Sequence, residues 1–113
     1  MSKRDNTLLL EDMHEAALKI KNYTSGYSLS DFLNDDKTID AVVRNLEIIG
    51  EASNRIESDF KSENPEIPWN QLRGLRNRIV HEYFGIDLEI VWTVISESMD
   101  ELISWIEIAL KNN

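Results

Sequence analysis

The sequence contains no cysteine, and its 113 residues include only four glycines and two prolines. Without cysteine the chain has no disulfide scaffold, no thiolate zinc site and no cysteine nucleophile. So few turn-forming residues argue against a sandwich or barrel of many short strands. The longest nearly apolar run, residues 90–95, is far shorter than the ~20 residues that a membrane span needs. No apolar signal core follows the start of the chain, and we expect a cytoplasmic protein with no membrane association.

Positive charge is also scarce, because 12 Lys and Arg residues face 21 Asp and Glu residues and the formal net charge is −9. Such a chain repels polyanions over most of its surface, so nucleic-acid binding requires a local basic patch. Residues 68–83 carry three Arg and one Glu, a local charge of +2, which leaves −9 − 2 = −11 for the rest. This segment attracts phosphate if it forms a site; otherwise it is an ordinary solvated helix face.

Apolar residues recur at spacings of three and four along most of the chain, which predicts amphipathic helices. The first helix carries its stripe from Leu9 to Tyr23, and the second carries one from Ile39 to Phe60 without interruption. Pro68 suits the first position of the third helix, and Asp87 suits the cap of the fourth. The helices are expected at about 4–24, 39–60, 68–83 and 88–109, with a short turn at 30–33.

Four helices with short links predict an all-α fold, an antiparallel four-helix bundle with a short extra turn, as one domain over residues 1–113. The apolar stripes of the second and fourth helices are wider than one packing partner needs. The surplus apolar surface favours a homodimer.

One residue of the third helix breaks its apolar pattern. The stripe that must face the core consists of Leu72, Leu75, Ile79 and Tyr83. Arg76 lies inside this stripe, where an unpaired guanidinium is too costly to bury. It must therefore be paired, with Glu47 or Glu51 of the second helix as candidates, or emerge at an interface. A buried structural ion pair is the simpler of these readings.

The opposite face of this helix is polar. Asn77 and His81 stack one turn apart, flanked by Arg73 and Arg78. A histidine near a helix end often only caps carbonyl groups, but its pKa near ~6.5 also suits proton transfer at neutral pH. Arg76 and His81 are about 140° apart on the wheel and do not share a face. They meet on one substrate at the helix edge, or where a second copy of the helix supplies the complement across a dimer interface.

Other patterns favour structural roles. Glu11 and His14 have the E-x-x-H spacing of di-iron bundles, but no second E-x-x-H accompanies them, so we expect no metal site and an exposed His14. Trp92 and Trp105 lie in apolar stripes and are expected in the core or an interface, whereas Trp69 is expected to fix the start of the third helix. No glycine-rich phosphate loop is present, so the chain is not expected to use ATP itself.

Residues 76–83, Arg-Asn-Arg-Ile-Val-His-Glu-Tyr, match the pattern R-N-x-x-x-H-x-Y. With this motif the chain resembles the HepT family of HEPN-domain toxins. Residues 40–52 resemble the second-helix signature of that family, and Ile67-Pro68-Trp69 before the motif and residues 84–88 after it are also typical. The resemblance covers nearly the whole chain, and no motif position is missing.

The resemblance implies a HEPN-like bundle that dimerises through its motif helices, so that both helices line one cleft. It implies a metal-independent RNA endonuclease, the toxin of a type VII toxin–antitoxin system. Arg76 and His81 correspond to the catalytic pair and Asn77 to the supporting polar residue, and Arg73 and Arg78 are candidates for RNA binding. The toxin itself requires no cofactor.

The resemblance also implies a regulatory partner. A nucleotidyltransferase antitoxin of the MntA type transfers AMP from ATP to the motif tyrosine, here Tyr83, and this modification inactivates the toxin. ATP and magnesium are then used only by the antitoxin. A bulky anionic group two residues from His81 would block the substrate phosphate.

The residues suit this chemistry because RNA carries its own nucleophile, the ribose 2′-OH. A histidine removes that proton or protonates the leaving 5′-oxygen, and an arginine stabilises the charge that develops on phosphorus. The expected products are a cyclic phosphate and a 5′-hydroxyl, from RNA and not from DNA. Two alternatives remain open: a non-catalytic subunit that docks on or regulates the nucleotidyltransferase, with Arg76 in an ion pair and Tyr83 in the core, and a bundle that binds small nucleotides in the same cleft.

Overall fold

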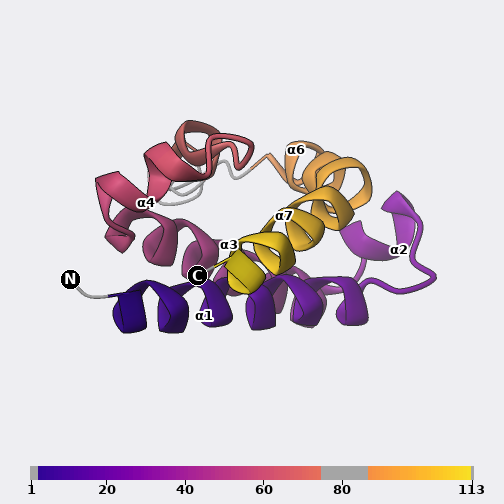
Figure 1. Cartoon of the computed structure of the whole chain (residues 1–113). Helices are drawn as coiled ribbons and strands as arrows, with labels where there is room; N and C mark the ends of the chain where they lie inside the picture. The colour runs from indigo at the N-terminus through magenta and orange to yellow at the C-terminus, as the bar shows by residue number, and fades with distance from the viewer. Residues whose placement is uncertain (1–2, 75–86, 113) are drawn as a thin grey trace.

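The computed structural model describes residues 3–74 and 87–112, and every regular element within these ranges is a helix (Figure 1). The elements are α1 (Lys3–Tyr23), α2 (Leu29–Leu33), α3 (Asp36–Arg55), α4 (Ser58–Glu63), α6 (Leu88–Thr93), the π-helix η1 (Val94–Ser98) and α7 (Met99–Asn112). Residues 69–74 form the first turns of a further helix. The all-α class is confirmed. None of the described helices is long and apolar enough to cross a bilayer.

Helix α1 packs against both α3 and α7, and Figure 1 shows α3 running back along it and α7 crossing it obliquely. Its buried positions recur at steps of four and three, with two adjacent alanines in the middle and one residue just past the helix end, and they are Asn6, Leu10, Met13, Ala16, Ala17, Ile20 and Thr24. The predicted stripe was wrong at its ends, because Leu9 is half-buried and Tyr23 is 37% exposed. The ends of the true stripe are polar residues that satisfy backbone groups: the Thr24 hydroxyl donates to the Ile20 carbonyl at 2.8 Å.

An ion pair and a side-chain hydrogen bond join α1 to α7. The Lys21 Nζ atom lies 2.9 Å from Asp100 Oδ1, and His14 Nε2 lies 2.9 Å from Glu107 Oε2. The expectation that His14 is an exposed helix residue was therefore wrong, since its side chain is half-buried against a partner from the last helix. The residues that the structure describes contain no group of three potential metal ligands.

The second apolar stripe is divided between two helices, so the prediction of an uninterrupted stripe through Phe60 was wrong. Helix α3 ends at Arg55, Ile56 and Glu57 have extended backbones, and α4 begins at Ser58. The bend buries both Ile56 and Phe60 over the end of the core. Its backbone is held from α1, because the Asn6 side-chain oxygen accepts a hydrogen bond from the Glu57 N–H at 3.3 Å.

The fourth predicted helix is continuous but not uniform. Asp87 caps it as predicted, since its carboxylate accepts hydrogen bonds from two backbone N–H groups of the first turn. The π-helix η1 then interrupts the α-helical bonding, and its i→i+5 bonds accommodate one more residue per turn than an α-helix does. The wider turn absorbs the extra residue within the helix. Before it α6 packs against α2, and after it α7 packs against α1 (Figure 1).

The start of α3 provides a pH-dependent test of stability. Asp35 caps this helix, and its pKa is held below the ordinary value, chiefly by a hydrogen bond from the Tyr27 hydroxyl and then by bonds from Thr38. Because the folded-state pKa is the lower one, this stabilisation is present above the ordinary pKa of 3.8 and is lost as the pH falls through the folded value. We expect Tyr27→Phe to lower the free energy of unfolding modestly at pH 7, with the difference disappearing in strong acid.

The measurement is urea unfolding of both proteins from pH 2 to pH 7. Tyr23→Phe is the matched control, since Tyr23 is exposed at the end of α1 and the change is not expected to alter the pH profile. If Tyr27→Phe lowers the free energy of unfolding by the same amount at the lowest pH as at pH 7, the lost interaction does not depend on the ionised Asp35 carboxylate.

Candidate functional site

Five of the predicted site residues, Arg76, Asn77, Arg78, His81 and Tyr83, lie outside the residues that the structure describes. The described part of the site is the segment that leads into them, together with the helices that surround this segment. The geometry of these parts determines where the motif begins and which chemical groups lie beside it.

The segment before the motif is anchored to α4 by Trp69. The indole N–H donates to the Asn64 carbonyl at 3.0 Å, and the ring meets Phe60 edge-on with centroids 6.4 Å apart. The expectation that Trp69 fixes the start of this helix is confirmed. Pro68 precedes the first helical residue instead of occupying it, and its carbonyl accepts the first helical hydrogen bond, from Leu72, at 3.0 Å.

Residues 69–74 present two different sides. Leu72 is 6% exposed and faces inward, as the stripe predicted. Arg73 is exposed and lies one turn after Trp69, on the side of α4. The predicted partners of Arg76, Glu47 and Glu51, lie one turn apart on α3, Glu47 half-buried and Glu51 exposed.

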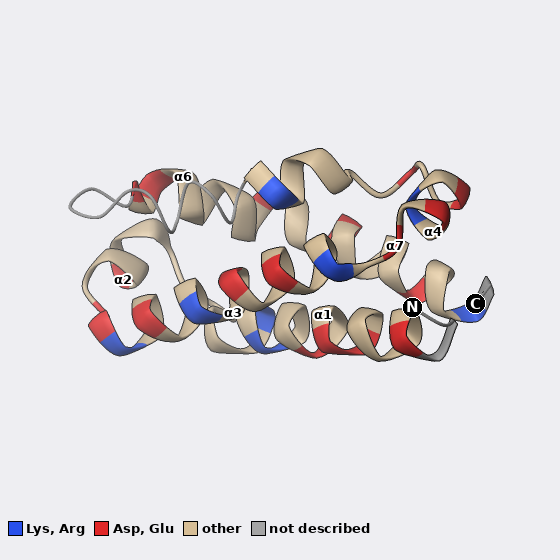
Figure 2. Cartoon of the chain, turned by 90° about the vertical axis from the view of Figure 1, so that its left-hand side faces the viewer, with Lys and Arg blue, Asp and Glu red and all other residues tan. Residues whose placement is uncertain are grey.

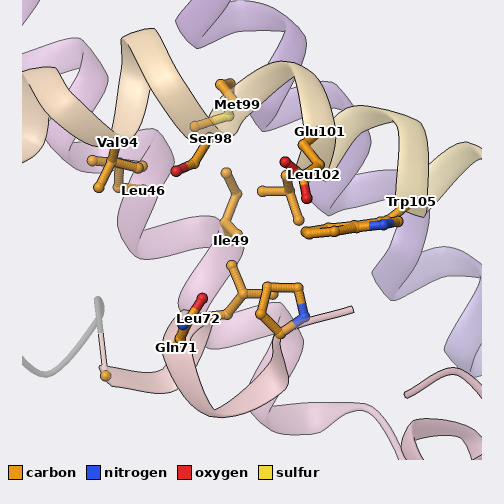
Figure 3. A pocket seen from close by; sticks show the side chains of 12 residues that line it. Leu46, Ile49, Gln71, Leu72, Val94, Ser98, Met99, Glu101, Leu102 and Trp105 are labelled. Carbon is orange, nitrogen blue, oxygen red and sulfur yellow. The ribbon is translucent and has the colours of Figure 1, made fainter. Parts of the chain in front are cut away.

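A cavity of about 480 Å³ lies between residues 68–74, α3, η1 and α7. Most of its wall is apolar, and Figure 3 shows Trp105 and Leu102 on one side and Ile49 and Leu72 on the other. Its polar lining groups come from Gln71, Ser98 and Glu101. A carboxylate in an apolar wall repels phosphate, so this cavity suits an apolar group better than an RNA backbone. It borders the segment at Gly74, the last described residue before the motif.

The side of the segment that faces α4 brings two cations together, although α4 itself also carries Asp59 and Glu63. The Lys61 ammonium lies over the Trp69 ring, 5.8 Å from its centroid, and Arg73 donates to the Asn70 side-chain oxygen at 3.4 Å. Partial burial, and after it the positive charge of Arg73, lowers the pKa of Lys61 below its ordinary value. Lys61 and Arg73 therefore lie close enough to repel each other. Figure 2 shows acidic residues spread over most of the helices, α4 included.

Neither the Lys61 neighbourhood nor its link to Arg73 was predicted from the sequence. Lys61 is eight positions before Trp69 and belongs to a different helix, so no helical spacing connects them. The bend at residues 56–57 places α4 beside the segment, and a sequence pattern read as one uninterrupted stripe could not indicate it. Arg73 was predicted as an RNA-binding residue, and the structure places it on an exposed surface.

These features define an all-helical protein. In it, residues 69–74 lie just before the motif, carry the exposed Arg73 and are anchored to α4 by Trp69. Comparison with known proteins gives the family: residues 13–108 match the family described as Ribonuclease HepT-like. The chain belongs to the HepT-like ribonuclease family.

Individual relatives agree with this assignment. The protein named "Probable ribonuclease HepT" of Thermococcus cleftensis is 44% identical over 100 residues, which cover 88% of this chain and 91% of the relative. The protein named "Putative RNase MJ1380" of Methanocaldococcus jannaschii is 40% identical over 108 residues, 96% of this chain and 99% of the relative. No solved structure matches the chain.

Proposed function

We propose that this protein is a metal-independent RNA endonuclease and the toxin of a type VII toxin–antitoxin system. One observation carries the proposal: residues 76–83 hold a complete R-N-x-x-x-H-x-Y motif within a chain that belongs to a ribonuclease family. The relatives named as RNases cover nearly the whole chain, which supports an activity that belongs to this domain itself.

In this proposal the RNA supplies the nucleophile. One His81 side chain takes the proton of the ribose 2′-OH while the oxygen attacks the adjacent phosphorus, and the bond to the 5′-oxygen breaks. The His81 of a second copy gives a proton to that leaving oxygen, and Arg76 stabilises the charge on the phosphoryl oxygens. Asn77 supports this pair. The products are a 2′,3′-cyclic phosphate and a 5′-hydroxyl, and DNA is not cut because it lacks the nucleophile.

The proposed assembly is a cytoplasmic homodimer whose two motif helices line one cleft. The helical spacing predicted for residues 76–83 puts Arg76 and His81 about 140° apart, so in this proposal a second helix related by two-fold symmetry supplies the complement. The local charge of +2 over residues 68–83 draws RNA to this cleft in a protein whose net charge is −9.

The proposed regulation is the transfer of AMP from ATP to Tyr83 by a cognate nucleotidyltransferase. Tyr83 is two residues from His81, and an added nucleotide brings both bulk and negative charge to a place where the substrate phosphate must bind. ATP and magnesium belong to the partner in this scheme.

The activity is tested with purified protein and a labelled single-stranded RNA in buffer with EDTA. We expect cleavage that continues without divalent metal and leaves a cyclic phosphate and a 5′-hydroxyl. An oligodeoxynucleotide of the same sequence is the control and is expected to remain intact. Products with a 5′-phosphate, or cleavage that requires added magnesium, would contradict the mechanism.

The regulation is tested by co-expression with the neighbouring nucleotidyltransferase gene, followed by mass spectrometry. We expect the peptide that contains Tyr83 to gain the mass of AMP, and Tyr83→Phe to remain unmodified. The wild-type chain expressed alone is expected to be toxic. If neither the wild type nor His81→Ala is toxic when expressed alone, and the complex with the nucleotidyltransferase still forms, the alternative of a non-catalytic subunit that regulates its partner is favoured.

A further inference from the structure

The contact between α4 and residues 69–74 gathers two cations and an aromatic ring on one side of the motif segment. The Trp69 ring lies between the elements, with Lys61 over it at 5.8 Å and Arg73 one helical turn further on. The indole is fixed by its hydrogen bond to the Asn64 carbonyl, and the ring in turn holds the Lys61 ammonium by a cation–π contact. Lys61, Trp69 and Arg73 are called the basic platform below.

No described carboxylate forms an ion pair with either cation of the platform. Two other lysines do have such a partner, since Lys19 lies 3.3 Å from Glu15 and Lys21 lies 2.9 Å from Asp100. A protein with net charge −9 has many carboxylates available, so two adjacent cations without one are an unfavourable arrangement in the free protein. An anion placed between them would remove the repulsion.

We propose that the basic platform binds the RNA backbone outside the scissile position, with Lys61 and Arg73 each contacting a phosphate and Trp69 holding Lys61 in place. This inference rests on the proposed RNA substrate. Arg73 is three residues before Arg76 in sequence, so the platform adjoins the motif along the chain. The apolar cavity on the other side of the segment is lined by Glu101, whose negative charge disfavours binding of an RNA phosphate there.

Lys61 and Arg73 are binding residues in this scheme and have no part in the chemical step. Their loss is therefore expected to weaken RNA binding and raise KM while leaving kcat unchanged. Each lost contact with a single-stranded backbone reduces the slope of log K against log salt by about 0.7. Variants that only disturb the local structure are not expected to change this slope, so it distinguishes a binding role from a structural one.

The test measures fluorescence anisotropy with a labelled single-stranded RNA that is 2′-O-methylated throughout, so that it binds without being cut. Lys61→Gln and Arg73→Gln are each expected to weaken binding roughly fivefold near physiological salt, and the double variant is expected to lower the salt slope by about 1.4. Lys61→Arg keeps the charge and is expected to retain wild-type binding. Thermal unfolding by circular dichroism checks that each variant is folded.

The matched control is the double variant Lys19→Gln and Lys37→Gln, which also takes the net charge from −9 to −9 − 2 = −11. Lys37 lies in the first turn of α3, at the opposite end of this helix from α4, and Lys19 lies on α1. This control is expected to keep the wild-type slope. If both double variants weaken binding equally, the effect is that of net charge and the platform is not a site.

Other outcomes separate this inference from the proposed function. If the wild type cuts RNA but the platform variants keep its KM and salt slope, the inference is wrong and the function stands. If the wild type does not cut RNA but binds it through the platform, the inference stands and the nuclease proposal fails. Unchanged RNA binding with loss of the complex with the nucleotidyltransferase would assign the platform to a protein interface and overturn the inference.

Discussion

Replacing His81 with alanine is expected to reduce RNA cleavage by about 10²–10⁴-fold, the range that general acid–base catalysis supplies. In the proposed symmetric cleft, the substitution removes both the group that takes the 2′-OH proton and the group that protonates the leaving 5′-oxygen. RNA affinity is expected to change little, because binding depends on arginine and lysine side chains. The measurement is kcat and KM on a labelled RNA, with cell viability on expression as a second reading.

The matched control is His14→Ala, because the chain contains only two histidines. His14 lies on α1 and bonds to Glu107 of α7, so its loss affects the contact between helices and not the motif. It is expected to leave kcat unchanged. Full activity of His81→Ala, or an equal loss in the two variants, would remove His81 from the mechanism.

The largest effect on stability is expected from deletion of a single serine in the last long helix. Deletion of Ser104 from α7 rotates every later residue by about 100°, because each residue of an α-helix advances the chain by that angle. Ile106 and Ala109, both 0% exposed, then leave the core. Loss of a buried isoleucine alone costs about 2–5 kcal/mol, a large share of the ~5–15 kcal/mol that stabilises a domain. We expect the variant to be unfolded at 37 °C and to show no cooperative transition on heating.

Deletion of Ser96 is the matched control, and it is expected to leave the protein folded with a melting temperature close to that of the wild type. Ser96 is an exposed serine of the same continuous helix, but it lies in η1. Without it the π turn closes as an α turn, and residues after the deletion keep their direction. Thermal unfolding by circular dichroism distinguishes the two variants, and equal damage in both would mean that η1 does not absorb an extra residue.

The sequence predicted the helices well wherever an apolar stripe and a cap agreed. The stripe of α1 and the Asp87 cap placed helix boundaries within a residue or two. The bend at Ile56 and the π turn were missed because both leave the apolar spacing of three and four intact. The bend is held by a tertiary contact, because the Glu57 backbone N–H donates to the side-chain oxygen of Asn6 in α1.

The candidate site shows a similar division. The motif, the inward-facing Leu72 and the anchoring role of Trp69 could be identified from local sequence. The position of Lys61 could not, because it depends on how α4 folds back after the bend. His14 was expected to be exposed because its partner, Glu107, is 93 positions away in sequence.

The contact between α1 and α7 has a consequence for how the protein is made. Ribosomes add about 5–20 residues per second, so the 93 positions between His14 and Glu107 take about 5–20 s to synthesise. Throughout that interval the inner face of α1 lacks one of its two covering helices, and the domain cannot complete its core. If the proposed toxic activity requires the finished fold, each nascent chain is inactive for several seconds, during which the proposed antitoxin can reach it.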